Sequence, residues 1–144
     1  MKKFLLVLMC FCLLMPIFGC DSALKKSDEL AVPFIEALLL RDEAQMKNYI
    51  HPDYTETALP DDEFYQRLTD NHFFKVGNKL THLTAMDKQT VKDESVEGDL
   101  LKCNYIIVCS EVYYDVNLVI LDNDKGYGVI AVSMNLNTNP ELYR

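Results

Sequence analysis

Several residue types on which common protein chemistry depends are scarce in this chain. Its 144 residues include no tryptophan, only three histidines and only five glycines. No two histidines have the His-x-x-x-His spacing of a zinc site, and the chain contains no phosphate-binding glycine loop and no Gly-x-Ser-x-Gly motif. We therefore expect no metal and no cofactor.

Positive charge is also scarce. The chain has 14 Lys and Arg against 22 Asp and Glu, which gives a net charge of −8. Nucleic acid and anionic lipid headgroups carry negative charge, so an acidic protein is a poor partner for either. The composition therefore predicts no nucleic-acid binding.

The first twenty residues have the layout of an export signal. Lys2 and Lys3 precede an apolar run from Phe4 to Phe18. A transmembrane anchor is the alternative, although the run is shorter than the about 20 residues that cross a bilayer. The residues Ile17-Phe18-Gly19-Cys20 resemble the lipobox of bacterial lipoproteins, in which the cysteine is acylated and becomes the first residue of the mature chain. Phe18 is bulkier than the residue usually found at its position.

This resemblance implies a protein outside the cytoplasm, held on the cell membrane by acyl chains such as palmitate on Cys20. The expected organisation is a signal peptide over 1–19, a tether over 20–27 and one domain over 28–144. Without Lys2 and Lys3, 12 basic side chains remain against 22 acidic ones, a net charge of −10. Acyl chains, and not a basic patch, would then hold the protein on the membrane. By analogy with enterobacterial lipoproteins, Asp21 favours the inner membrane, but the choice between inner and outer membrane stays open.

The first part of the mature chain has helical periodicity. Ser27 or Asp28 can cap a helix whose apolar residues recur at helical spacing, although Pro33 favours a regular start near Val32. Shorter helices are expected over 43–50 and from Pro60 onward. The apolar residues of the first helix are Leu30, Phe34, Ala37 and Leu38.

From Leu80 onward the apolar period changes to two, which predicts strands over 80–91, 100–109, 112–121 and 127–136. A two-residue turn at Ser110-Glu111 places Ile107 opposite Tyr114 and Cys103 opposite Leu118, so one face is continuously apolar. Ser-Glu is a poor sequence for a tight primed turn, which favours a bulge there. Closing the next hairpin over 122–126 places Leu118 opposite Ile130 and Ile120 opposite Gly128. The sequence of that hairpin resembles the start of a calcium loop but lacks the glutamate at its twelfth position, so we interpret it as a turn.

Two cysteines remain beyond the signal and the lipobox. Cys103 and Cys109 are expected on one strand, about 20 Å apart at ~3.3 Å per residue. A disulfide needs α-carbons within about 7 Å of each other. We therefore predict two buried free thiols.

The order of helices and strands predicts an α+β domain with N-terminal helices packed on one face of a curved antiparallel sheet of about four strands. The segment Phe34-Ile35-Glu36-Ala37-Leu38, with Arg41, Asp42 and Ala44, resembles the first helix pair of the nuclear transport factor 2-like superfamily, the cone-shaped, cystatin-like group. His51-Pro52-Asp53 resembles the loop that closes this pair. The resemblance implies a cone-shaped fold and leaves function open, because this fold hosts enzymes, ligand pockets and dimerisation modules.

Three groups of residues are candidates for function. His51 and Asp53 are candidates for an acid–base pair in the mouth of the cone, although both also suit a turn after a helix. Tyr105 and Tyr114 are expected on the inner face, first as core aromatics and second as walls of a ligand pocket. An apolar patch is expected on the outer face, where superfamily members often pair, and it suggests a homodimer or an envelope-protein partner. The patch comprises Ile106, Val108, Tyr113, Val119, Val129 and Ala131, around Asp115 and Asn117.

The function expected from these features is binding, either of a small apolar molecule in the cone or of an envelope protein on the sheet. The alternative is a small enzyme of the isomerase or dehydratase kind that uses His51, Asp53 and a tyrosine. A third possibility is an interaction-only subunit of an envelope complex. An open polar cone favours the enzyme, whereas a filled cone with an exposed apolar sheet face favours the interaction.

Overall fold

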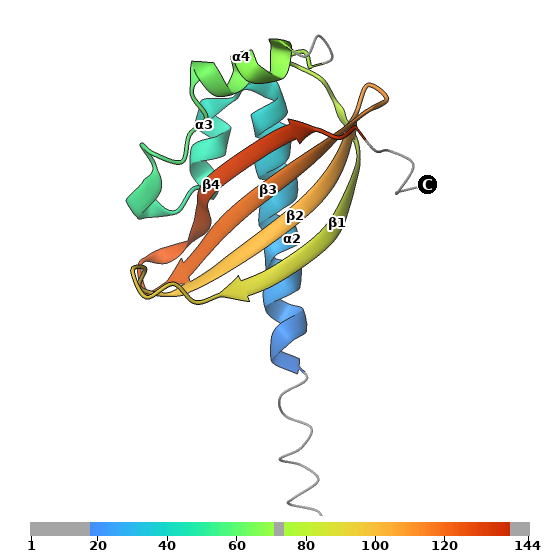
Figure 1. Ribbon diagram of the computed structural model, residues 1–144. Helices are drawn as coiled ribbons and strands as arrows, with labels where there is room; N and C mark the ends of the chain where they lie inside the picture. The colour runs from blue at the N-terminus through green and yellow to red at the C-terminus, as the bar shows by residue number, and fades with distance from the viewer. Residues whose placement is uncertain (1–17, 71–73, 139–144) are drawn as a thin grey trace, which may run out of the picture.

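A computed structural model describes residues 18–70 and 74–138, the first seven of these as backbone only (Figure 1). The fold is α+β, as predicted: helices on one side of a four-stranded antiparallel sheet in the order β1-β2-β3-β4. The helical elements are α2 (Phe18–Leu40), α3 (Glu43–Met46), η1 (Lys47–Tyr49), η2 (Pro52–Tyr54) and α4 (Asp62–Asp70). The strands are β1 (Leu80–Val91), β2 (Asp99–Cys109), β3 (Val112–Asn123) and β4 (Gly126–Leu136).

Helix α2 lies along the inner face of the sheet and starts earlier than expected. A helix start at Ser27, Asp28 or Val32 is wrong, because the helix already runs from Phe18. Ser27 is fully buried, and the Asp28 carboxylate pairs with Lys88 of β1. Pro33 lies inside the helix and removes one of its hydrogen bonds. The next residue, Phe34, is fully buried in the core. None of the helices in 18–70 and 74–138 is long and apolar enough to cross a membrane.

The hairpin of β2 and β3 confirms the predicted register. Ile107 lies opposite Tyr114, and Cys103 lies opposite Leu118. The expected bulge at the turn is wrong, because the pairing continues to Cys109 and Val112. Ser110 and Glu111 both have positive φ, 51° and 67°, as a tight primed turn requires. The continuous apolar face of the two strands therefore outweighs the poor turn sequence.

The hairpin of β3 and β4 differs from the prediction. The strands pair up to Asn123 and Gly126, which shifts the pairing by one residue from the predicted register. A bulge between Val119 and Ile120 shifts the rest of the pairing by a second residue. Leu118 therefore lies opposite Val132, and Ile120 opposite Val129. The bulge restores the alternation of faces along the rest of β4.

One hydrophobic core lies between the helices and the inner face of the sheet. Cys103 and Cys109 belong to it as buried free cysteines, which confirms the prediction of two free thiols. Strands β2 and β3 contribute alternate residues to this core, so the residues between them form the outer face, whereas β1 adds only the partly buried Leu80 and Leu83. Its fully buried large side chains include Phe34, Ile35, Leu38, Leu39, Met46, Tyr105, Ile107, Leu118 and Ile120.

Candidate functional site

His51 lies where the chain passes from the helices to the edge of the sheet. Its backbone N–H donates to the Val129 carbonyl of β4 at 3.0 Å. A Cβ atom on Gly128 would lie only 2.4 Å from the His51 nitrogen, so this close approach requires glycine. The imidazole is fully buried by this crossing.

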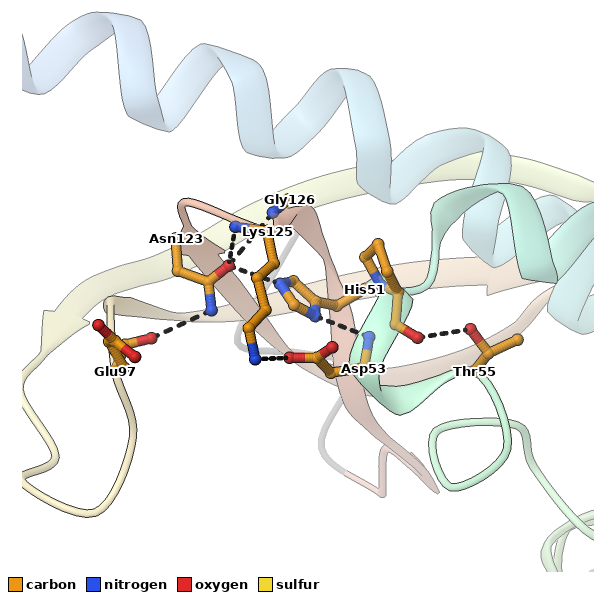
Figure 2. A network of polar contacts seen from close by, with 8 residues as sticks. His51, Asp53, Thr55, Glu97, Asn123, Lys125 and Gly126 are labelled. Atoms are coloured by element: carbon orange, nitrogen blue, oxygen red, sulfur yellow. Dashed lines mark hydrogen bonds and ion pairs between the residues drawn. The ribbon is translucent and has the colours of Figure 1, made fainter.

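Both nitrogens of the His51 ring have partners (Figure 2). Nδ1 accepts a hydrogen bond of 3.2 Å from the Asp53 backbone N–H and therefore carries no proton. Nε2 lies 2.9 Å from Asn123 Oδ1, an acceptor, and therefore carries the proton of a neutral ring. The lone pair that a general base would use is thus held by the cap of η2, which supports a structural role for His51.

The Asp53 carboxylate does not face His51. It pairs with the Lys125 ammonium at 2.9 Å, and this hydrogen bond and charge raise the pKa of Lys125 above its usual value. Asn123 Oδ1 also accepts from the backbone N–H groups of Lys125 and Gly126 at 3.0 and 3.2 Å. The network therefore joins the η2 loop to the β3–β4 turn and places no acid beside the histidine.

Tyr105 and Tyr114, the candidate pocket walls, are 0% and 1% exposed. Burial raises the pKa of both hydroxyls above the usual value. Tyr105 donates to Asp28 Oδ1 at 3.1 Å, whereas the Tyr114 hydroxyl has no hydrogen-bond partner among the described residues. Phe74 packs edge-on against Tyr114, with ring centroids 6.0 Å apart. At these two tyrosines the cone is filled by side chains.

An ion pair between Asp28 and Lys88, which the sequence analysis missed, lies at the other end of the inner face. Asp28 Oδ1 is 2.5 Å from Lys88 Nζ, whose side chain is only 11% exposed. Lys88 lies opposite Cys103, an inner position of β2. A lysine at an inner-face position of a strand is the signal that could have found it, because such a charge needs a partner.

The other histidine that the structure describes is His82. His82 is exposed on β1, and its Nε2 lies 2.9 Å from Thr84 Oγ1. Among residues 18–70 and 74–138, no three His, Cys, Asp or Glu side chains are placed to hold a metal ion.

The outer face of the sheet carries most of the expected apolar patch. Val108, Tyr113 and Val119 are half-buried there, and Ile106 is 3% exposed. Val129 was wrongly placed, because the β3–β4 register turns it to the inner face, where it is fully buried opposite Ile120. A groove of about 480 Å³ crosses this face and is lined by His82, Thr84, Met86, Ile106, Val108 and Tyr113.

A row of polar side chains crosses the same face beside that groove. Asn104 donates to Asn117 Oδ1 at 2.7 Å, and Asn117 donates to Ser133 Oγ at 3.4 Å. A second groove, of about 260 Å³, runs past Asn104, Asn117 and Val119. The outer face therefore combines shallow grooves, apolar surface and a fixed row of amides.

Comparisons with known proteins place the fold. No family model matches the chain, and no curated protein matches it. Among solved structures, an NTF-2 like protein of unknown function from Silicibacter pomeroyi superimposes with a TM-score of 0.51 over 83% of this chain and 100% of that chain. The identity is 8%, so the match shows the fold alone. The chain has an NTF2-like fold, as its sequence predicts.

Proposed function

We propose that this protein is a membrane-anchored lipoprotein outside the cytoplasm and that it works by binding a second copy of itself through the outer face of its sheet. The contrast between the two faces of the sheet carries the proposal. Tyr105 and Tyr114, expected first as core aromatics and second as pocket walls, are buried on the inner face. The outer face instead presents half-buried apolar side chains around open grooves.

The chemistry of the outer face suits a protein partner. Interfaces combine apolar and aromatic residues at their centre with hydrogen-bonding groups around them. Met86, Val108 and Tyr113 supply apolar and aromatic surface. The polar row of Asn104, Asn117 and Ser133 supplies the hydrogen-bonding groups.

The membrane anchor is supported by the sequence Ile17-Phe18-Gly19-Cys20 after a basic and apolar leader. Replacing Cys20 with Ala should abolish incorporation of labelled fatty acid and leave the unprocessed precursor. Cys12→Ala, within the apolar run, is the matched control and should be labelled and processed normally. Normal processing and labelling of the Cys20→Ala protein would refute the anchor.

The interface is tested by placing a charge on the outer face. Val119→Lys puts an ammonium beside the second groove without touching the inner core, whereas Val76→Lys makes the same change at an exposed site away from the sheet. Chemical cross-linking in intact membranes should trap a dimer of the unmodified and Val76→Lys proteins and much less of Val119→Lys. If the unmodified protein gives no dimer, or the two variants cross-link equally, the outer face is not the interface.

A further inference from the structure

Lys26 and Asp28 of α2 together contact all four strands of the sheet. Lys26 Nζ lies 3.6 Å from Asp122 Oδ2 of β3 and 3.8 Å from the ring centroid of Tyr127 of β4. Two residues later, Asp28 pairs with Lys88 of β1 and accepts the hydrogen bond from Tyr105 of β2. We call these six residues the α2 clamp.

The clamp lies close to the lipidation candidate along an unbroken helix. Cys20 and Lys26 both belong to α2. Six residues of α-helix rise about 9 Å at 1.5 Å per residue. A flexible linker of the same number of residues would sample many directions. Here the helix fixes both the distance and the direction from Cys20 to the sheet.

The start of α2 also defines which end of the domain lies next to it. The β1–β2 loop and the β3–β4 turn lie toward this start, and α4 lies at the opposite end of the molecule (Figure 1). The contacts agree with this arrangement. Lys26 contacts Asp122 near the β3–β4 turn, whereas Leu38, near the end of α2, accepts a hydrogen bond from Tyr65 of α4.

We infer that α2 is a rigid stalk that holds the end of the domain formed by residues 92–98 and 123–126 against the lipid surface, with α4 pointing away from it. This inference rests on the proposed acylation of Cys20. The facing end is acidic on balance, because Asp93, Glu94, Glu97 and Asp124 outnumber its two basic residues, Lys92 and Lys125. Anionic headgroups would repel it within the Debye length of about 8–10 Å. The surface that it faces without repulsion is therefore a neutral, zwitterionic one.

The absence of tryptophan from the chain makes this orientation directly measurable. Glu94→Trp places a single fluorophore in the β1–β2 loop, and Glu63→Trp places one in α4, with the same loss of charge at an exposed position. Each acylated full-length product is purified from membranes and reconstituted into phosphatidylcholine vesicles that carry a nitroxide on the headgroup. The nitroxide should strongly quench the emission of Glu94→Trp. The emission of Glu63→Trp should be the same in vesicles with and without nitroxide.

A flexible Gly/Ser segment inserted between Ala23 and Leu24 provides the second arm. It should leave vesicle binding intact and remove most of the quenching at position 94. Equal quenching at positions 94 and 63, or quenching unchanged by the insertion, overturns the rigid stalk while leaving the anchor in place. If the protein with its natural Cys20 carries no acyl chain and does not float with vesicles, both the anchor and the stalk are overturned.

Discussion

The two faces of the sheet are made of neighbouring residues of the same strands, yet one is closed and the other open. Along β3, Val116 and Leu118 on the inner face are fully buried under α2, whereas Asn117 and Val119 on the outer face reach the surface. The inner residues are constrained by packing, because close-packed interiors tolerate little change in volume. On the outer face Ile106 is also buried, at 3% exposed, but Val108, Tyr113 and Val119 reach the surface, and we propose that this apolar surface serves binding. The predictions below test this difference between the faces.

The largest difference should appear between adjacent residues of β3. Leu118→Ala removes a fully buried side chain and should lower the free energy of unfolding by about 2–5 kcal/mol. Val119→Ala, one position along on the outer face, should cost less than about 1 kcal/mol. Urea denaturation of both variants measures the two losses. Similar losses would mean that the outer face is also part of the core.

The α2 clamp should contribute the next largest effect, because it closes one end of the inner face. Asp28→Ala leaves the Lys88 ammonium and the Tyr105 hydroxyl without their shared acceptor and should cost about 1–3 kcal/mol. Glu29→Ala, exposed on the next position of the helix, is the control and should stay within about 0.5 kcal/mol. Thermal unfolding distinguishes the two variants, and an equal effect would show that the clamp adds no stability.

The tight turn of β2 and β3 holds the two faces in register at a conformational cost. Glu111 has a φ of 67°, which costs a residue other than glycine roughly 1–2 kcal/mol. Glu111→Gly should therefore raise stability by about 0.5–1 kcal/mol after the entropy of the added glycine is subtracted. Asp124, in the turn of β3 and β4, has no positive φ, so glycine relieves no strain there. Asp124→Gly should therefore lower stability by about 0.4–1 kcal/mol, because glycine adds conformational entropy to the unfolded chain. Denaturation curves that shift in the same direction for both variants would contradict this explanation.

The smallest energetic effect, but a sharp chemical one, concerns the thiols of the inner face. Burial raises the pKa of Cys109 to about 11 and that of Cys103 above its usual value, and the thiolate is the reactive form. Neither should be alkylated at pH 8 in the folded protein, whereas Val119→Cys on the outer face should add one reactive thiol. Mass spectrometry counts the adducts, and fast labelling of Cys109 in the native state would show that the inner face opens.

The same pKa shift predicts a pH dependence of stability. Between about pH 9 and pH 11 the unfolded chain loses the Cys109 proton while the folded chain keeps it, so stability should fall as the pH rises through this window. Cys109→Val lacks this titration, so its stability should fall less over the same range. Parallel curves for the two proteins would mean that Cys109 does not contribute.

The sequence predicted the fold and one hairpin well because the alternation of apolar residues decides which side chains share a face. A shift of two residues would keep that face apolar, with Cys103 opposite Val116, so the two-residue turn is what selects the observed register. No residue pattern in the sequence indicates the bulge beside Val119. The predicted register of β3 and β4 was therefore wrong, and Val129 was placed on the outer face. The early start of α2 was missed because residues 21–27 read as polar, although Ser27 and Asp28 find partners on the distant sheet. His51 lies in the predicted loop, but one of its two ring partners, Asn123, is 72 positions away, which local patterns do not reveal.

The central claim is that the outer face of the sheet is the surface that binds, and a photo-reactive amino acid tests it most directly. Tyr113 lines the larger groove of the outer face, and Tyr54, equally half-buried, lies on η2 away from that face. We predict that a photo-reactive phenylalanine analogue at position 113 forms an adduct of twice the chain mass in intact membranes, and that the same analogue at position 54 does not. No adduct at position 113, or equal adducts at both positions, would contradict the account.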